Sequence, residues 1–179
     1  MNTKFETISL SLDVPFRIAR GTTETTENVV VSIEHAGETG YGAAAPSGRY
    51  GETAATTEAL FPELLPVVEE ISDPYARRTL ADRLSAIVRG NPAAKAAIDI
   101  ALWDLAGKLL EKPVYRLLGC SADPEACPPT SFTIGIDETA AMIARAREAV
   151  EADYRVLKVK LGTDRDLGIV AGIREAVPE

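Results

Sequence analysis

The sequence predicts an α+β domain, made of an antiparallel meander and helices, followed by the start of a parallel β/α structure. Alternating apolar and polar runs, separated by turn residues, fill the first 44 residues. Helical periodicity then extends from Thr53 to Gly119. From residue 130 to residue 176 a strand, a helix, a second strand and a second helix follow one another, which is the order typical of parallel strands.

The first part of the chain predicts three strands that pair as a meander. Lys4–Leu12 alternates and predicts the first strand, which Pro15 is expected to interrupt. Asn28–Glu34 predicts the second strand and Gly40–Ala44 the third. Phe16–Thr26 is polar and rich in threonine, so we interpret it as an exposed connection.

Prolines and glycines are expected to divide the helical region between Thr53 and Gly119 into separate helices. Pro62 and Pro66 are expected to break its beginning into short pieces. Asp73-Pro74 is typical of a helix start, and Gly90 of a helix end. A new helix is predicted from Asn91-Pro92 to about residue 111.

The last of these helices carries a stripe of apolar residues that predicts burial. Two aspartates, Asp99 and Asp104, interrupt it, and we expect partners that tie the helix to neighbouring backbone. The stripe follows spacings of three and four residues and comprises Ala94, Ala97, Ile98, Ala101, Leu102, Leu105 and Leu109.

A pair of lysines lies in the second strand of the β/α part, predicted over Arg155–Gly162. Lys158 and Lys160 are two positions apart, so both side chains leave the same face of the strand. In an antiparallel, half-buried strand that face is solvent. In a parallel barrel it is the interior, where chemistry takes place at the carboxyl ends of the strands. Val156 would share this interior, and the residues that contact the helices would be Leu157, Val159 and Leu161.

Composition limits the classes of function. The net charge of −8 argues against nucleic-acid binding, which needs a basic face. No apolar run approaches the ~20 residues of a membrane span, and the N-terminus lacks a signal-peptide core. We therefore expect a cytoplasmic protein with no membrane or nucleic-acid partner. The proline-rich segment Cys120–Pro129 predicts a boundary between domains of residues 1–125 and 126–179.

Residues 96–119, which run from Ala-Ala-Ile-Asp to Arg-Leu-Leu-Gly, resemble the helix that opens the barrel region of the enolase superfamily, in its muconate-lactonizing and mandelate-racemase branches. The strand around Lys158 and Lys160 is similar to the same branches. Thr130–Asp137, Thr-Ser-Phe-Thr-Ile-Gly-Ile-Asp, resembles the dipeptide epimerases, of which the alanine–glutamate type is the best known. The resemblance extends over essentially the whole chain.

The resemblance implies an α+β capping domain followed by a (β/α) TIM-type barrel with a Mg²⁺ site. We expect the chain to be truncated after about two βα units, because a barrel needs eight strands. No metal ligand is expected in the chain; the Mg²⁺ ligands and an opposing lysine are expected beyond residue 179. Activity is then expected only of the full-length parent, and this chain alone is expected to be inactive.

The resemblance also implies roles for five residues. Lys160 would be one of two opposed bases that move the α-proton, and Lys158 would lie beside the substrate carboxylate and stabilise an enediolate. Thr133 would contact the substrate, while Arg20 and Arg49 would lie on loops over the pocket. Many alanine–glutamate epimerases carry an arginine near the position of the glycine that follows Arg20, and that arginine reaches the acidic side chain of the substrate. Because this chain has glycine there, the resemblance does not imply a preference for glutamate. A free lysine, with a pKa near ~10.4, becomes a useful base only when its pKa falls to roughly 7–8.

The implied partner is a small molecule, a dipeptide or an acylated amino acid, and the family allows a homo-oligomer. Other enzymes of the branch are alternatives: an N-acylamino acid racemase, a muconate cycloisomerase or an o-succinylbenzoate synthase. A non-catalytic capping module or fragment is the alternative from a different class.

Overall fold

The computed structural model describes residues 1–178 and divides into two compact units. Unit 1 contains residues 1–10 and 27–122, and unit 2 contains residues 11–26 and 123–178. Unit 1 is a three-stranded sheet with helices, and unit 2 holds two parallel strands with a helix after each, which confirms the predicted fold class. The domain boundary between residues 125 and 126 stays a prediction.

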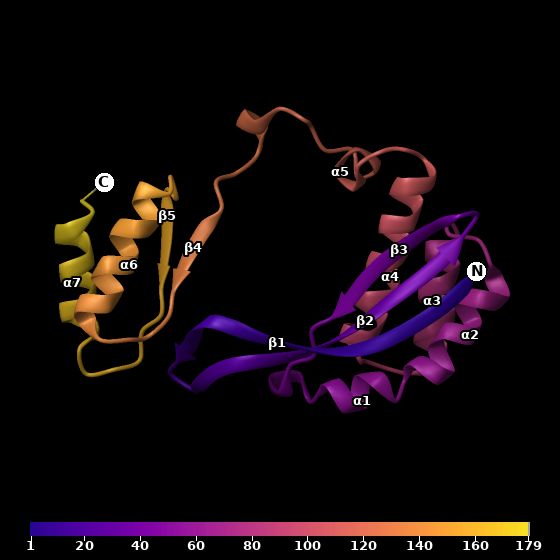
Figure 1. Ribbon diagram of the computed structural model, residues 1–179, viewed down its shortest axis with the longest axis horizontal. Coiled ribbons are helices and arrows are strands. Elements are labelled where there is room, and N and C mark those ends of the chain that lie inside the picture. Colours follow the sequence, from indigo (N-terminus) through magenta and orange to yellow (C-terminus); the bar gives the residue numbers. More distant parts are fainter. Residues whose placement is uncertain (179) are drawn as a thin grey trace. The chain divides into compact units, whose positions relative to one another are not determined.

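The predicted meander is confirmed, with longer strands than expected. The strands are β1 (Asn2–Ile18), β2 (Gly21–His35) and β3 (Glu38–Ala44), in the spatial order β1-β2-β3 (Figure 1). Strands β2 and β3 pair antiparallel, with Val31 opposite Gly42.

Two expectations about this sheet are wrong. Pro15 does not interrupt β1, because β1 is an edge strand and an edge tolerates the missing N–H of proline. Phe16–Thr26 is not a loop, since β1 and β2 continue through it and only Ala19 and Arg20 form the turn. The threonines that suggested a polar connection are residues that favour strands.

The helices of unit 1 follow the sheet along the chain. Their bounds are η1 (Gly48–Tyr50), α1 (Ala54–Glu58), α2 (Phe61–Ile71), α3 (Arg77–Ile87), α4 (Pro92–Leu109) and α5 (Val114–Leu117). Pro66 lies inside α2 instead of ending it, whereas Pro62 lies in the first turn, where no N–H is needed. Asp73 does not start α3. Its Oδ1 accepts a hydrogen bond from the Tyr75 N–H at 2.9 Å in a turn, and the helix begins four residues after Asp73, at Arg77.

The core of unit 1 lies between the sheet and its helices (Figure 1). The predicted apolar stripe of α4 is buried, except that Leu109 packs only partly buried against it. Helix α4 approaches β3 so closely that a Cβ added to Gly42 would lie 2.0 Å from the carbonyl oxygen of Ala97. The absence of a side chain at this position therefore allows the helix to contact the sheet backbone.

One of the two aspartates of α4 ties the helix to the sheet. Asp104 Oδ2 accepts the backbone N–H of Tyr41, on β3, at 2.8 Å, and also the Lys108 ammonium at 2.8 Å. The expectation of a backbone partner is thus confirmed for Asp104. Asp99 has no such bond among the residues that the structure describes.

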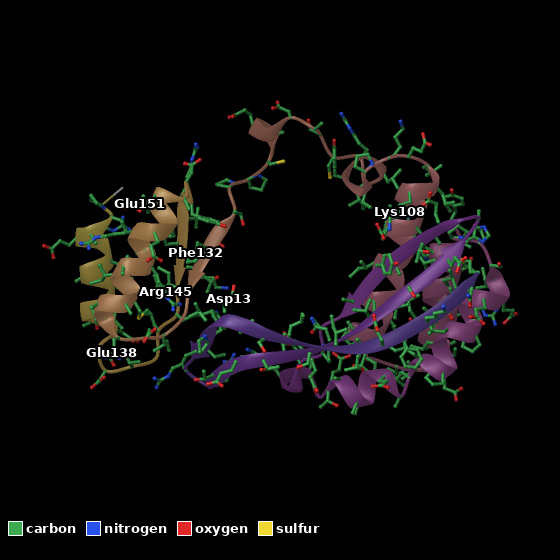
Figure 2. The ribbon with its side chains drawn as sticks, viewed as in Figure 1. Asp13, Lys108, Phe132, Glu138, Arg145 and Glu151 are labelled. Atoms are coloured by element: carbon green, nitrogen blue, oxygen red, sulfur yellow. The ribbon has the colours of Figure 1, made fainter. Side chains whose placement is uncertain are left out.

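Unit 2 contains the predicted strand–helix–strand–helix segment. Its elements are η2 (Pro124–Ala126), β4 (Ser131–Ile134), α6 (Thr139–Glu151), β5 (Val156–Val159) and α7 (Asp166–Ala176). Strands β4 and β5 pair in parallel, and their helix-side residues join α6 and α7 in one apolar cluster around Ile134 and Met142. Phe132, labelled in Figure 2, lies at the edge of this cluster and contacts the ring of Tyr154 at a centroid distance of 5.1 Å. Within residues 1–178, no helix has the length and apolar character needed to cross a bilayer.

Candidate active site

Parallel pairing decides which face of β5 the lysines occupy. Leu157 and Val159 pack against the cluster of α6 and α7, so Lys158 leaves the opposite face. In the parallel register, Lys158 is paired with Thr133 of β4. The parallel interpretation of this strand is therefore confirmed over the antiparallel one. Leu161 differs from expectation, because it is 43% exposed and lies outside the cluster.

Lys160 follows the end of β5 and is held there by the backbone. Its N–H donates to the carbonyl oxygen of Ile134 at 2.9 Å, which continues the parallel ladder beyond β5. The positive charge of Lys158 is the main cause that lowers the pKa of the Lys160 ammonium. Partial burial, hydrogen bonding with Lys158 and the charge of Arg20 lower this pKa further. A lower pKa makes the neutral amine of Lys160 more accessible than that of an isolated lysine.

Arg20 reaches this region from the turn between β1 and β2. The tip of that hairpin belongs to unit 2 and contacts the carboxyl end of β4, because the Ile136 N–H donates to the carbonyl oxygen of Arg17 at 2.8 Å. Gly162, with φ +135°, lies so close to the tip that an added Cβ would be 2.5 Å from the Cβ of Ala19. A hollow of about 320 Å³ lies where they meet, lined by Arg17, Ile18, Ala19, Gly21, Thr22, Ile136, Gly162 and Thr163.

The loop after Lys160 is fixed by a carboxylate from the first turn of α7. Asp166 accepts the backbone N–H of Gly162 at 2.9 Å and that of Thr163 at 2.9 Å, together with the Thr163 hydroxyl. The two backbone hydrogen bonds are the main cause that lowers the pKa of the Asp166 carboxyl. These hydrogen bonds hold the backbone of Gly162 and Thr163 at the first turn of α7.

A second link joins the loops after β4 and β5. Arg165 Nη1 donates to Glu138 Oε2 at 2.7 Å, and its Nη2 donates to the carbonyl oxygen of Asp137 at 3.3 Å. Glu138 is labelled in Figure 2, at the start of α6. The Arg165 side chain thus connects the loop after β5 to the loop after β4, and both loops lie beside the hairpin tip.

Of the five predicted site residues, four lie in unit 2, namely Thr133, Lys158, Lys160 and Arg20. Arg49 lies in η1 of unit 1 and is exposed, so its part in the site stays a prediction. The roles of all five residues stay predictions. Gly162 and Asp166 were not singled out from the sequence, although Gly-Thr-Asp-Arg-Asp after a strand is a loop pattern in which a carboxylate can cap backbone N–H groups.

The arrangement offers two amines and a hydroxyl, from Lys158, Lys160 and Thr133. Among residues 1–178, no group of three or more His, Cys, Asp or Glu side chains is placed to hold a metal ion. The described residues therefore do not fit a catalytic Mg²⁺ by themselves. What they do provide is the positive charge of Lys158 and Arg20, which lowers the pKa of Lys160.

Comparison with known proteins identifies similar chains. Residues 3–119 match the N-terminal domain of the mandelate racemase / muconate lactonizing enzyme family. An L-Ala-D/L-Glu epimerase of Bacteroides thetaiotaomicron is 37% identical over 97% of this chain and 44% of its own length. The chain spans about half the length of the curated relatives it matches.

Two solved structures extend the likeness. One is a dipeptide epimerase of Enterococcus faecalis in complex with Mg and L-Leu-L-Tyr, with a TM-score of 0.82 and 35% identity over 98% of this chain and 49% of that one. The other is a dipeptide epimerase of Methylococcus capsulatus in complex with Mg and L-Arg-D-Lys, with a TM-score of 0.85 and 33% identity over 99% of this chain and 50% of that one.

Proposed function

The chain belongs to the mandelate racemase / muconate lactonizing enzyme family of the enolase superfamily, and from this we propose that the whole protein is a dipeptide epimerase. It would invert a dipeptide at one α-carbon. The observation that carries the proposal is the face of β5 that bears the lysines and is free of helices. It occurs in a chain that is 33–37% identical to dipeptide epimerases over nearly all of this chain's own length.

Proton transfer is the step assigned to Lys160. Its neutral amine would take the α-proton, so that the C–H bond breaks, an N–H bond forms, and the electron pair moves onto the substrate carboxylate as an enediolate. A proton returned to the opposite face of the carbon by a second base would complete the inversion. The lowered pKa of Lys160 supports this role, because the base must be neutral before it accepts a proton.

The other predicted site residues would bind and orient the substrate. Lys158 would lie beside the carboxylate and stabilise the added negative charge of the enediolate. Thr133 is its cross-strand neighbour and would contact the same end of the dipeptide. Arg20 and Arg49 would influence which side chains the protein accepts.

The proposal includes a Mg²⁺ ion bound by residues of the whole protein beyond residue 179. Support for the ion comes from the Mg in both similar epimerase structures.

The test is a screen of the whole protein against a dipeptide library, with stereochemical inversion followed by chiral chromatography. We expect inversion of at least one class of dipeptide, and loss of inversion in Lys160→Ala by about 10²–10⁴-fold. Lys112→Ala is the matched control, because Lys112 is exposed in unit 1 and should leave the rate unchanged.

The same screen separates the alternatives. Inversion of N-acylamino acids without inversion of dipeptides would assign the protein to the racemases of the branch. If no dipeptide and no acylated amino acid is inverted, then the epimerase proposal is wrong.

A further inference from the structure

The hairpin tip and the loop after β5 meet, within unit 2, at a contact that has no room for another side chain. Gly162 lies in that loop with φ +135°, a backbone conformation that residues other than glycine rarely adopt. A Cβ added to Gly162 would lie 2.5 Å from the Cβ of Ala19, and the next nearest atom, the Ala19 Cα, would be at the ordinary contact distance of 3.5 Å. The missing side chain of Gly162 therefore sets how closely the tip can approach.

The loop side of this contact is anchored, and the tip side is not. The Gly162 N–H donates to Asp166 Oδ2 at 2.9 Å, and the Thr163 N–H and hydroxyl both donate to Asp166 Oδ1 at 2.9 Å. Ala19, in contrast, is exposed and belongs to the two-residue turn between β1 and β2. A side chain at position 162 would therefore displace the tip and leave the loop in place.

The tip carries a charge that acts on Lys160. Arg20 directly follows Ala19, and its positive charge contributes to the lowered pKa of the Lys160 ammonium, to which Lys158 contributes most. The interaction between two charges weakens as the distance between them grows. A second link holds the tip here, because the Ile136 N–H donates to the carbonyl oxygen of Arg17 at 2.8 Å. The effect of Arg20 therefore depends on how the tip is docked.

We infer that Gly162 and Ala19 are positioning residues, whose close contact holds the hairpin tip against the loop after β5 and so keeps Arg20 beside Lys160. Neither residue has a side chain that could contact a substrate beyond a methyl group. They act through Arg20. The consequence for substrate binding rests on the proposed function, whereas the placement of Arg20 does not.

A pair of variants of the whole protein isolates this contact. Gly162→Ala adds the Cβ. Adding Ala19→Gly to it removes the atom that this Cβ would meet, while the unfavourable φ at position 162 is the same in both variants. Gly37→Ala is the matched control, because Gly37 has φ +87° and no atom lies within 4 Å of the Cβ that it would gain. The readouts are the Lys160 pKa from NMR titration, hydrogen–deuterium exchange of the Ile136 amide, and KM and kcat for an accepted dipeptide.

We expect Gly162→Ala to raise the pKa of Lys160, by less than Lys158→Met does, because Arg20 is a smaller cause of the lowered pKa than Lys158. The Ile136 amide should exchange faster, since its acceptor lies on the displaced tip. KM should rise about 10-fold, the effect of one weakened charged contact, with a smaller change in kcat. Ala19→Gly should reverse all three changes, and Gly37→Ala should cause none of them.

A fall in kcat at unchanged KM would indicate a loss of active protein and would contradict the inference. A double variant that is no closer to the original protein than Gly162→Ala would contradict it too, because the backbone conformation alone would then explain the defect. If the whole protein inverts no dipeptide, the proposed function is wrong, and the Lys160 pKa and the Ile136 exchange rate still decide the inference. If Gly162→Ala does not fold, Ala19→Val enlarges the other side of the same contact, and an unchanged pKa and exchange rate in that variant would contradict the inference.

Discussion

At the scale of single residues, the pKa of Lys160 is lowered by its neighbours, mainly by the charge of Lys158. The Lys158-Val159-Lys160 order predicts that both ammonium groups share a face, and the structure confirms that this face is turned away from the helices. The sequence does not predict that Arg20, 140 residues earlier in the chain, adds its charge to Lys160. That effect requires the hairpin tip to fold against β4 and β5.

The pKa of Lys160 gives the first prediction at this scale. We expect NMR titration of lysine side chains to show a lower pKa for Lys160 than the unperturbed 10.5, and an increase in Lys158→Met. The unfolded state then binds more protons than the folded state between the two pKa values, so the free energy of unfolding rises with pH across that window. An unchanged Lys160 pKa in Lys158→Met would show that the Lys158 charge is not the main cause.

Asp166 gives a second prediction. Its lowered pKa means that the ionised carboxylate stabilises the folded state above the unperturbed value of 3.8, and that this stabilisation is lost as pH falls through the folded-state pKa. Asp166→Asn should therefore lower the Tm more near pH 7 than at pH 2. Asp164→Asn, a change in the same loop at an exposed residue, is the control. Equal Tm losses at both pH values would indicate a packing defect instead of lost charge.

At the scale of elements, periodicity correctly predicted those helices and strands that bury one apolar face. It failed at prolines, where the surrounding tertiary structure determines whether an element is interrupted. The stripe of α4 and the two βα units were predicted because their apolar residues face one side. Pro15 and Pro66 were wrongly predicted to interrupt their elements. The sequence does not show that Pro15 lies in an edge strand or that packing supports the helix around Pro66. Gly42 carries no periodic signal, yet its lack of a side chain sets the distance between β3 and α4.

Gly42 therefore gives a prediction at this scale. An added Cβ would lie 2.0 Å from a backbone oxygen that cannot move aside easily, so we expect Gly42→Ala to lower the free energy of unfolding by about 1–3 kcal/mol. Gly48→Ala is the matched control, because nothing lies within 4 Å of the Cβ that it would add. Urea denaturation of both variants measures the difference. Equal stability of the two variants would show that β3 and α4 are farther apart than described.

At the scale of the whole molecule, the hairpin that begins in unit 1 ends in unit 2 and contributes Arg20 there. The resemblance to the epimerases predicted that Arg20 lies on a loop over the pocket, whereas periodicity alone predicted only an exposed loop. The substrate side chain was not predicted, because the similar epimerase structures hold dipeptides as different as L-Leu-L-Tyr and L-Arg-D-Lys. Under the proposed function, specificity would depend on residues that differ between relatives, whereas the lysine face would serve the shared chemistry.

The account depends most on Lys160 as the base on one face of the substrate, and deuterium exchange tests this directly. The whole protein and its Lys160→Ala variant are incubated in D₂O with each stereoisomer of an accepted dipeptide, and α-proton exchange is followed by NMR. We expect Lys160→Ala to slow exchange from at least one stereoisomer by about 10²–10⁴-fold, while Lys112→Ala exchanges both at the original rate. Exchange from both stereoisomers at the original rate in Lys160→Ala would contradict the account.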